Sequence, residues 1–227
     1  MPNIALNLNQ IIASINAIKG TMQVELIAVS KTFPQQLIQE AYLYGQRKFG
    51  ESYPQELATK AQELIDLSIE WHFIGNIQSN KTKLIAQHAS WVHTITQFQH
   101  AKRLNDQRPA DMPPLQILIE VNLSQESTKS GVNNLDEIIQ LATEISSLPK
   151  LKLRGLMGMA SNSSDQQLVK TQFQQLTTYL KQLQAHDFDQ LDQLSMGMSQ
   201  DYPLAIAAGA TLVRIGSNIF GARTYDN

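Results

Sequence analysis

The sequence predicts an α/β protein that folds as a single TIM-type (β/α)8 barrel over residues 1–227, with an extra helix at the N-terminus. Short apolar runs alternate with longer helical patterns about eight times along the chain. Some of these runs, such as residues 26–29 and 117–119, are apolar on both faces, as in a parallel sheet covered on both sides. A chain of 227 residues suits one barrel domain, with a doubly wound sheet as the alternative.

The N-terminal helix is indicated by Ile4, Leu8, Ile11, Ile12 and Ile15, whose spacing places them on one helix face. The expected strands cover residues 24–30, 48–51, 70–75, 91–95, 115–122, 153–159, 193–198 and 212–216. Helical patterns follow at residues 35–44, 54–67, 81–88, 135–148 and 165–186, and an Ala-rich run at residues 202–210 is also helical in spacing. The Pro-rich cluster at residues 107–114 is interpreted as a loop, because the alternation resumes after it.

Composition excludes several classes of protein. A formal net charge of -2 without a basic run argues against binding to nucleic acid. The chain has no cysteine, so it has neither disulfides nor a thiol nucleophile, and its five histidines lack metal-ligand spacing. No apolar run approaches the roughly 20 residues of a membrane helix, and the N-terminus does not have the pattern of a secretory signal. We therefore expect a cytoplasmic protein without a metal, and a monomer because no large exposed apolar helix face is evident.

Two expected strands end in small residues that can surround an anion. Gly197, Met198 and Ser199 stand at the end of one strand, and Gly216 and Ser217 stand at the end of the next. Glycine allows backbone N–H groups to approach a ligand closely, and serine adds a hydroxyl donor. Because the carboxyl ends of barrel strands share one mouth, these residues predict a phosphate site.

Lys31 ends the first strand, at the same predicted mouth. Most lysines at such positions extend into solvent. A partly desolvated lysine beside other cations can instead act as a nucleophile toward an aldehyde. Spacing alone leaves both interpretations open.

The sequence blocks around these residues resemble the YggS/PROSC family of pyridoxal-5′-phosphate homeostasis proteins. The blocks are AVSK (28–31), GESYPQE (50–56), WHFIGNIQSNK (71–81), VNLSQESTKSG (121–131), LRGLMGM (153–159), LSMGMSQD (194–201) and VRIGSNIFGAR (213–223). They cover nearly the whole chain in the family's order. Members of this family resemble the barrel domain of alanine racemase and lack its second, β-rich domain.

The resemblance implies that the cofactor is pyridoxal 5′-phosphate and that Lys31 forms the Schiff base with it. It further implies a phosphate cup and a residue that faces the pyridine nitrogen. The cup is formed by Ser199, the backbone of Met198, Gly216 and Ser217; Arg214 faces the nitrogen, and Ser195 and Met196 line the cup. Ser52 stands where the family commonly has asparagine, and Asn76 lies where the family varies, so neither is assigned a role.

An arginine opposite the ring nitrogen disfavours protonation of that nitrogen and weakens the ring as an electron sink. Alanine racemase shares this arrangement, but its second domain supplies another acid/base group, and we expect no such domain in this chain. We therefore expect a non-catalytic carrier or buffer of pyridoxal phosphate. Its expected partners are apo-enzymes that depend on this cofactor. A racemase-like enzyme is the alternative, and a Schiff-base aldolase is a third hypothesis.

Overall fold

The computed structural model describes residues 3–124, 126 and 129–222, and its eight parallel strands close into a barrel in the order β1 to β8. Strand β1 pairs with both β2 and β8, which closes the sheet. The predicted (β/α)8 barrel is confirmed. The strands are β1 Glu25–Val29, β2 Lys48–Glu51, β3 Glu70–Phe73, β4 Trp91–Ile95, β5 Leu115–Val121, β6 Leu151–Gly158, β7 Gln193–Ser195 and β8 Leu212–Ile215.

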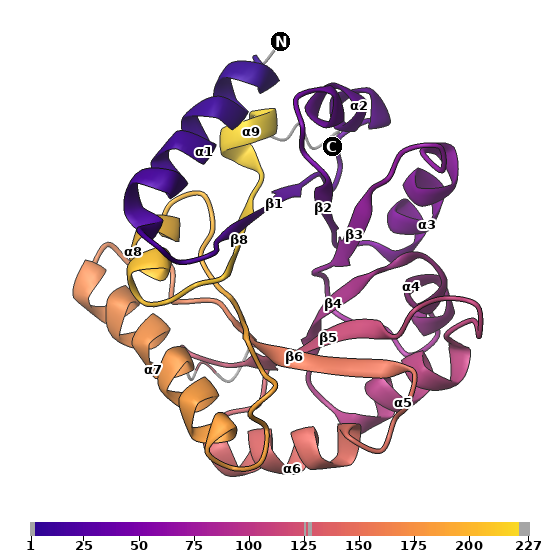
Figure 1. The fold of residues 1–227 in the computed structure, drawn as a ribbon, viewed down its shortest axis with the longest axis vertical. Coiled ribbons are helices and arrows are strands. Elements are labelled where there is room, and N and C mark those ends of the chain that lie inside the picture. Colours follow the sequence, from indigo (N-terminus) through magenta and orange to yellow (C-terminus); the bar gives the residue numbers. More distant parts are fainter. Residues whose placement is uncertain (1–2, 125, 127–128, 223–227) are drawn as a thin grey trace.

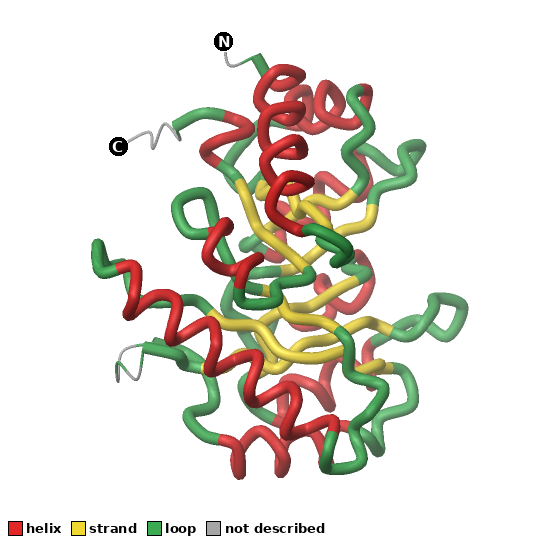
Figure 2. Tube along the Cα trace, turned by 60° about the vertical axis from the view of Figure 1, so that its left-hand side comes forward, coloured by secondary structure: helices red, strands yellow, loops and turns green. Residues whose placement is uncertain are grey.

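Helices surround the barrel on its outer side (Figures 1 and 2). They are α1 Ile4–Lys19, α2 Gln35–Leu43, α3 Pro54–Glu63, α4 Thr82–His88, α5 Phe98–Gln107, α6 Leu135–Ile145, α7 Gln166–Gln184, α8 Tyr202–Ala207 and α9 Ser217–Phe220. Helix α5 was not among the predicted elements. Within the described part of the chain, no helix combines the length and the apolarity that crossing a membrane would need.

Helix α1 is the predicted N-terminal addition. The Asn3 side chain accepts a hydrogen bond from the Leu6 N–H and so caps the first turn. The helix lies beside α8 and α9 (Figure 1), and Asn7 Nδ2 donates to the Ile219 carbonyl at 2.9 Å. It buries four of its five predicted apolar positions, whereas Ile12 is 40% exposed. The helix therefore covers the segments that follow β7 and β8.

Strand β7 ends earlier than the predicted 193–198 strand. Gly197 has φ of +90°, a conformation that side chains with a Cβ rarely adopt. A Cβ at this position would also lie 2.6 Å from the Ala205 Cβ. The chain turns at Gly197 and passes into α8, although the Arg214 N–H still donates to the Gly197 carbonyl at 3.0 Å. The turn places Met198 and Ser199 beyond the end of the strand.

Candidate functional site

A hollow of about 780 Å³ lies at the carboxyl ends of the strands. It is lined by Lys31, Met198, Ser199, Arg214, Gly216 and Ser217, the six residues predicted to contact the cofactor. Ser195 and Met196, which were also expected to line the cup, are buried and are not among its lining residues. Ser52 also lines this hollow, whereas Asn76 is not among its lining residues. The volume falls within the roughly 300–1,000 Å³ that is usual for small-molecule sites. The barrel thus brings together residues that are far apart in the sequence.

Two serines meet on one side of this hollow. The Ser217 hydroxyl donates to Ser199 Oγ at 3.1 Å, and Asn218 Nδ2 donates to the Ser199 carbonyl at 3.1 Å. Ser217 is the first residue of α9, and the first N–H groups of a helix have no acceptor within that helix. The Met198 N–H differs, because it donates to Asp201 Oδ1 at 2.6 Å. A phosphate can therefore use the two hydroxyls directly, but must compete with Asp201 for the Met198 amide.

Arg214 is a buried cation in this hollow, with only 5% of its surface exposed. Its Nη1 donates to Ser195 Oγ at 2.5 Å, and its Nη2 donates to the Gly158 carbonyl at 3.4 Å. Burial lowers the pKa of Arg214 to about 10, while the charges of Glu120 and Asp201 act in the opposite direction. The guanidinium therefore stays protonated at neutral pH.

A buried ionic cluster lies behind Lys31 and fixes the residue before it. The Ser30 hydroxyl donates to Glu51 Oε1 at 2.6 Å. Lys60 Nζ, on α3, donates to the Ser30 carbonyl at 2.8 Å, to Glu51 Oε1 at 2.9 Å and to Glu56 Oε1 at 2.7 Å. Burial raises the pKa of Glu51, and the Lys60 charge opposes that rise. Ser30 lies in the block AVSK, and Glu51 and Glu56 lie in the block GESYPQE, but sequence analysis did not predict that they form a cluster with Lys60.

The residue after Lys31 is held by the same cluster. Thr32 has φ of +66°, which is rare for a β-branched residue. Its N–H donates to Glu56 Oε1 at 2.6 Å, and this bond supports the strained turn. Lys31 therefore lies between two residues that this cluster holds by hydrogen bonds, and Lys31 itself also interacts with the protein.

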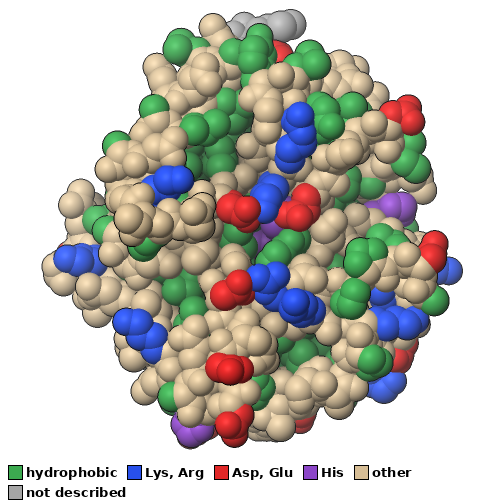
Figure 3. Space-filling model, in the orientation of Figure 1, with side chains coloured by type: hydrophobic (Ala, Val, Ile, Leu, Met, Phe, Trp, Pro, Cys, Tyr) green, Lys and Arg blue, Asp and Glu red, His purple; other side chains and the backbone are tan. Residues whose placement is uncertain are grey.

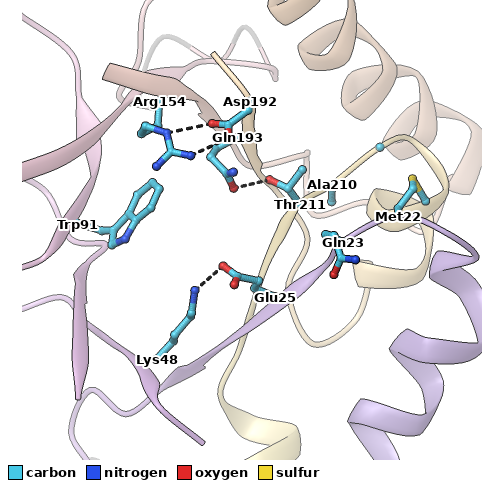
Figure 4. A pocket seen from close by; sticks show the side chains of 11 residues that line it. Met22, Gln23, Glu25, Lys48, Trp91, Arg154, Asp192, Gln193, Ala210 and Thr211 are labelled. Atoms are coloured by element: carbon cyan, nitrogen blue, oxygen red, sulfur yellow. Dashed lines mark hydrogen bonds and ion pairs between the residues drawn. The ribbon is translucent and has the colours of Figure 1, made fainter. Parts of the chain in front are cut away.

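A second hollow, of about 590 Å³, opens at the opposite, N-terminal mouth of the barrel. Charged side chains of both signs gather over the middle of this face (Figure 3). Glu25 and Lys48 pair on one side of the hollow, and Arg154 pairs with Asp192 at 2.6 Å on the other (Figure 4). Arg154 also lies over the Trp91 ring, 5.4 Å from its centroid. This hollow contains none of the predicted site residues, and the charged side chains that line it are paired with one another.

No group of three or more His, Asp or Glu residues with metal-binding geometry occurs among the described residues. The chemistry available at the carboxyl-end hollow therefore consists of an amine, hydroxyl donors and a permanent cation. These groups suit a small ligand that carries an aldehyde, an anionic phosphate and a basic ring nitrogen.

The family model of the alanine racemase N-terminal domain matches residues 6–224 of the chain. A pyridoxal phosphate homeostasis protein of Vibrio alginolyticus is 54% identical over 206 residues, which cover 89% of this chain and 88% of that relative. The chain belongs to the pyridoxal phosphate homeostasis protein family. Another family member, from Escherichia coli, is 46% identical over 233 residues, which cover 99% of each chain. The resemblance predicted from the sequence blocks is confirmed.

A solved structure shows the same fold. PipY of Synechococcus elongatus, determined with pyridoxal phosphate bound, is 33% identical and superposes with a TM-score of 0.86. The match covers 96% of this chain and 100% of PipY. The barrel described above is therefore the fold of a relative that holds the cofactor.

Proposed function

We propose that this protein binds pyridoxal 5′-phosphate in the carboxyl-end hollow, with Lys31 as the covalent attachment point, and serves the homeostasis of this cofactor as a carrier or buffer. The observation that carries the proposal is the meeting of Lys31, the serine pair and Arg214 in one hollow. Relatives named for pyridoxal phosphate homeostasis and the cofactor-bound PipY support it. The cytoplasmic location, the monomeric state and the recipient enzymes stay predictions.

The residues present fit the cofactor at three points. Ser199 and Ser217 offer hydroxyl donors to a phosphate dianion. Arg214 offers a fixed cationic donor to a ring nitrogen. When bound, pyridoxal phosphate supplies an aldehyde that condenses with a lysine amine, with loss of water, and a ring that can withdraw electrons.

Arg214 favours holding the cofactor over using it. With its pKa at about 10, the guanidinium does not release its proton to a ring nitrogen at neutral pH, and its charge opposes protonation of that nitrogen. Arg214 would thereby limit electron withdrawal by a bound ring, since strong withdrawal needs a protonated nitrogen. The protein's own residues thus bind and orient the cofactor while limiting its reactivity.

A racemase-like activity is the second candidate, and the match to the alanine racemase N-terminal domain favours testing it. The test incubates the cofactor-loaded protein with single enantiomers of alanine and other amino acids and follows the opposite enantiomer by chiral chromatography. Sustained turnover above a Lys31→Ala control would replace the carrier function with a catalytic one.

Paired titrations test the roles of the serines. The Ser199→Ala/Ser217→Ala double variant and the unchanged protein are each titrated with pyridoxal phosphate and with pyridoxal, which lacks the phosphate. We expect the double variant to bind pyridoxal phosphate at least about tenfold more weakly, since two hydrogen bonds to a charged group are lost. Binding of pyridoxal should change by less than about twofold. Equal losses for both ligands would show that the serines do not hold the phosphate.

A further inference from the structure

A chain of polar side chains crosses the apolar interior of the barrel. His72 Nε2 lies 3.0 Å from Glu70 Oε1, and His72 Nδ1 lies 2.9 Å from His93 Nε2. His93 Nδ1 lies 2.8 Å from Ser195 Oγ, which accepts the hydrogen bond from Arg214 Nη1 at 2.5 Å. The chain thus runs from β3 through β4 and across to β7 and β8.

The two ends of this chain lie at opposite mouths of the barrel. Arg214 lines the carboxyl-end hollow, where the cofactor is proposed to bind. Glu70 begins β3, and its side chain is 37% exposed and lies 3.3 Å from Lys48 Nζ at the N-terminal mouth. Figure 4 shows Lys48 directed at Glu25 in the hollow of that mouth. A charge at one mouth is therefore connected by hydrogen bonds to the cation at the other.

Apolar and aromatic side chains surround the middle of the chain. The Trp91 ring stacks on His72 with centroids 5.6 Å apart and an interplanar angle of 10°. Trp91 packs in one buried cluster with Ile27, Leu118, Met157 and Leu212. In such a low-dielectric setting, successive hydrogen bonds polarise one another.

Burial disfavours the charged form of both histidines. It lowers the pKa of His72, which faces Glu70, Lys48 and Glu25, and it lowers the pKa of His93 well below the usual value, with further lowering by His72 and Arg214. Burial alone would raise the pKa of Glu70, but the hydrogen bond from His72 and the charge of Lys48 outweigh burial and lower this pKa. Glu70 is therefore a carboxylate that only accepts hydrogen bonds.

The direction of every hydrogen bond follows from these charge states. His72 donates from Nε2 to Glu70, so its Nδ1 accepts from the Nε2–H of His93. The Nδ1 of His93 then accepts from the Ser195 hydroxyl, whose oxygen accepts from Arg214. Since arginine has only donors and a carboxylate only acceptors, the assignments from the two ends agree. All donors point from Arg214 toward Glu70.

We propose that Glu70, His72, His93 and Ser195 are positioning residues that orient Arg214 toward the ring nitrogen of the cofactor and couple that nitrogen to the charge of Glu70 at the N-terminal mouth. The contact between Arg214 and the ring nitrogen rests on the proposed function, but the hydrogen bonds from Arg214 to Glu70 are present in the protein without a cofactor. The hydrogen bonds and the coupling to the ring nitrogen therefore have separate tests.

The first test measures histidine tautomers in the protein without cofactor. Two-dimensional ¹H–¹⁵N spectra of the imidazole rings at pH 8, with His72→Gln and His93→Gln used for assignment, should show both rings as neutral Nε2–H tautomers. A proton on Nδ1 of either ring would overturn this series of hydrogen bonds. This result does not depend on whether pyridoxal phosphate binds.

The second test follows the ring nitrogen with ¹⁵N-labelled pyridoxal phosphate bound to the protein. Glu70→Gln removes the charge at the end of the chain. Glu25→Gln is the matched control, because Glu25 pairs with the same Lys48 but has no hydrogen bond to the chain. We expect the ring-nitrogen signal to move in Glu70→Gln and to stay in place in Glu25→Gln. An equal shift of the ring-nitrogen signal in both variants would mean that the carboxylates act only through space. That result would overturn the proposed coupling through the hydrogen bonds.

Variants at His93 test the middle of the chain. His93→Leu removes both hydrogen bonds, so we expect about tenfold weaker binding of pyridoxal phosphate, equivalent to about 1.4 kcal/mol, and a shifted ring-nitrogen signal. His93→Gln retains one donor and one acceptor, and should stay within about twofold of the unchanged protein. If His93→Leu matches the unchanged protein in both readouts, or His93→Gln fails to rescue them, the positioning role is wrong. If the unchanged protein takes up no cofactor, the proposed function fails. The tautomer measurement still shows whether the hydrogen bonds between Arg214 and Glu70 have the proposed direction.

Discussion

Replacement of the buried carboxyl of Glu120 should change how stability depends on pH. Glu120 lies on β5 with 3% of its surface exposed, and its Oε2 is buried without a hydrogen-bond partner. Burial raises its pKa from 4.5 to about 7, and the charge of Arg214 only partly opposes the rise. The folded protein therefore holds this proton between pH 4.5 and about 7, where the unfolded chain has released it. Stability from this group is lost as the pH rises through that range.

The magnitude follows from the same values. At about 1.4 kcal/mol per pH unit, a rise from 4.5 to about 7 costs the folded protein up to about 3 kcal/mol once the carboxyl is ionised. Glu120→Gln keeps the shape and cannot ionise, but it loses the attraction to Arg214. We expect the variant to match the unchanged protein within about 1 kcal/mol at pH 5 and to exceed it by about 1–3 kcal/mol at pH 8.

Urea unfolding at pH 5, 6, 7 and 8, followed by circular dichroism, measures this difference. Glu63→Gln is the control for loss of one negative charge, because Glu63 is exposed on α3. Its difference from the unchanged protein should not vary with pH by more than about 0.5 kcal/mol. Parallel pH curves for Glu120→Gln and the unchanged protein, or a variant that is less stable at pH 8, would refute the reasoning.

Three further substitutions have expected outcomes. Gly197→Ala places a Cβ 2.6 Å from the Ala205 Cβ at positive φ, so it should lower the free energy of unfolding by about 1–3 kcal/mol and weaken pyridoxal phosphate more than pyridoxal. Lys60→Met should cost about 3–5 kcal/mol in urea unfolding, and adding Glu51→Gln should restore at least half, because no buried carboxylate is then left unpaired. Thr32→Gly should relieve backbone strain and change the free energy of unfolding by less than about 1 kcal/mol in either direction. A loss above about 2 kcal/mol would show that the Thr32 side chain itself stabilises the fold.

The barrel could be predicted because its strands are short, apolar and regularly spaced. Helix α5 was missed because its sequence is mostly polar and buries only His100, Ala101 and Leu104. The strand at residues 193–198 was extended too far because Met196 and Met198 continue the apolar alternation. In the structure β7 ends at Ser195 and the chain turns at Gly197 with a positive φ. Glycine permits this conformation, but its presence in the sequence does not show that the chain adopts it.

The residues that line the carboxyl-end hollow could be grouped because the carboxyl ends of barrel strands meet at one mouth, whereas the roles predicted for Lys31 and Arg214 came from the family resemblance. The hydrogen bond from the Met198 N–H to Asp201 could not be predicted, since it depends on the conformation of the loop between these residues. Lys60 was missed because a helical lysine usually faces solvent. The interior chain through His72 and His93 was missed because its partners lie on strands whose neighbours are known only after the barrel closes.

Location of the covalent bond to the cofactor tests the central claim most directly. The protein is saturated with pyridoxal phosphate and reduced with borohydride, and the labelled peptide is identified by mass spectrometry. Lys83→Ala, which removes an exposed lysine of α4, is the matched control for Lys31→Ala. We expect one stoichiometric pyridoxyl label on Lys31, unchanged in Lys83→Ala and absent in Lys31→Ala. A label on another lysine, or no uptake of the cofactor at all, would contradict the account.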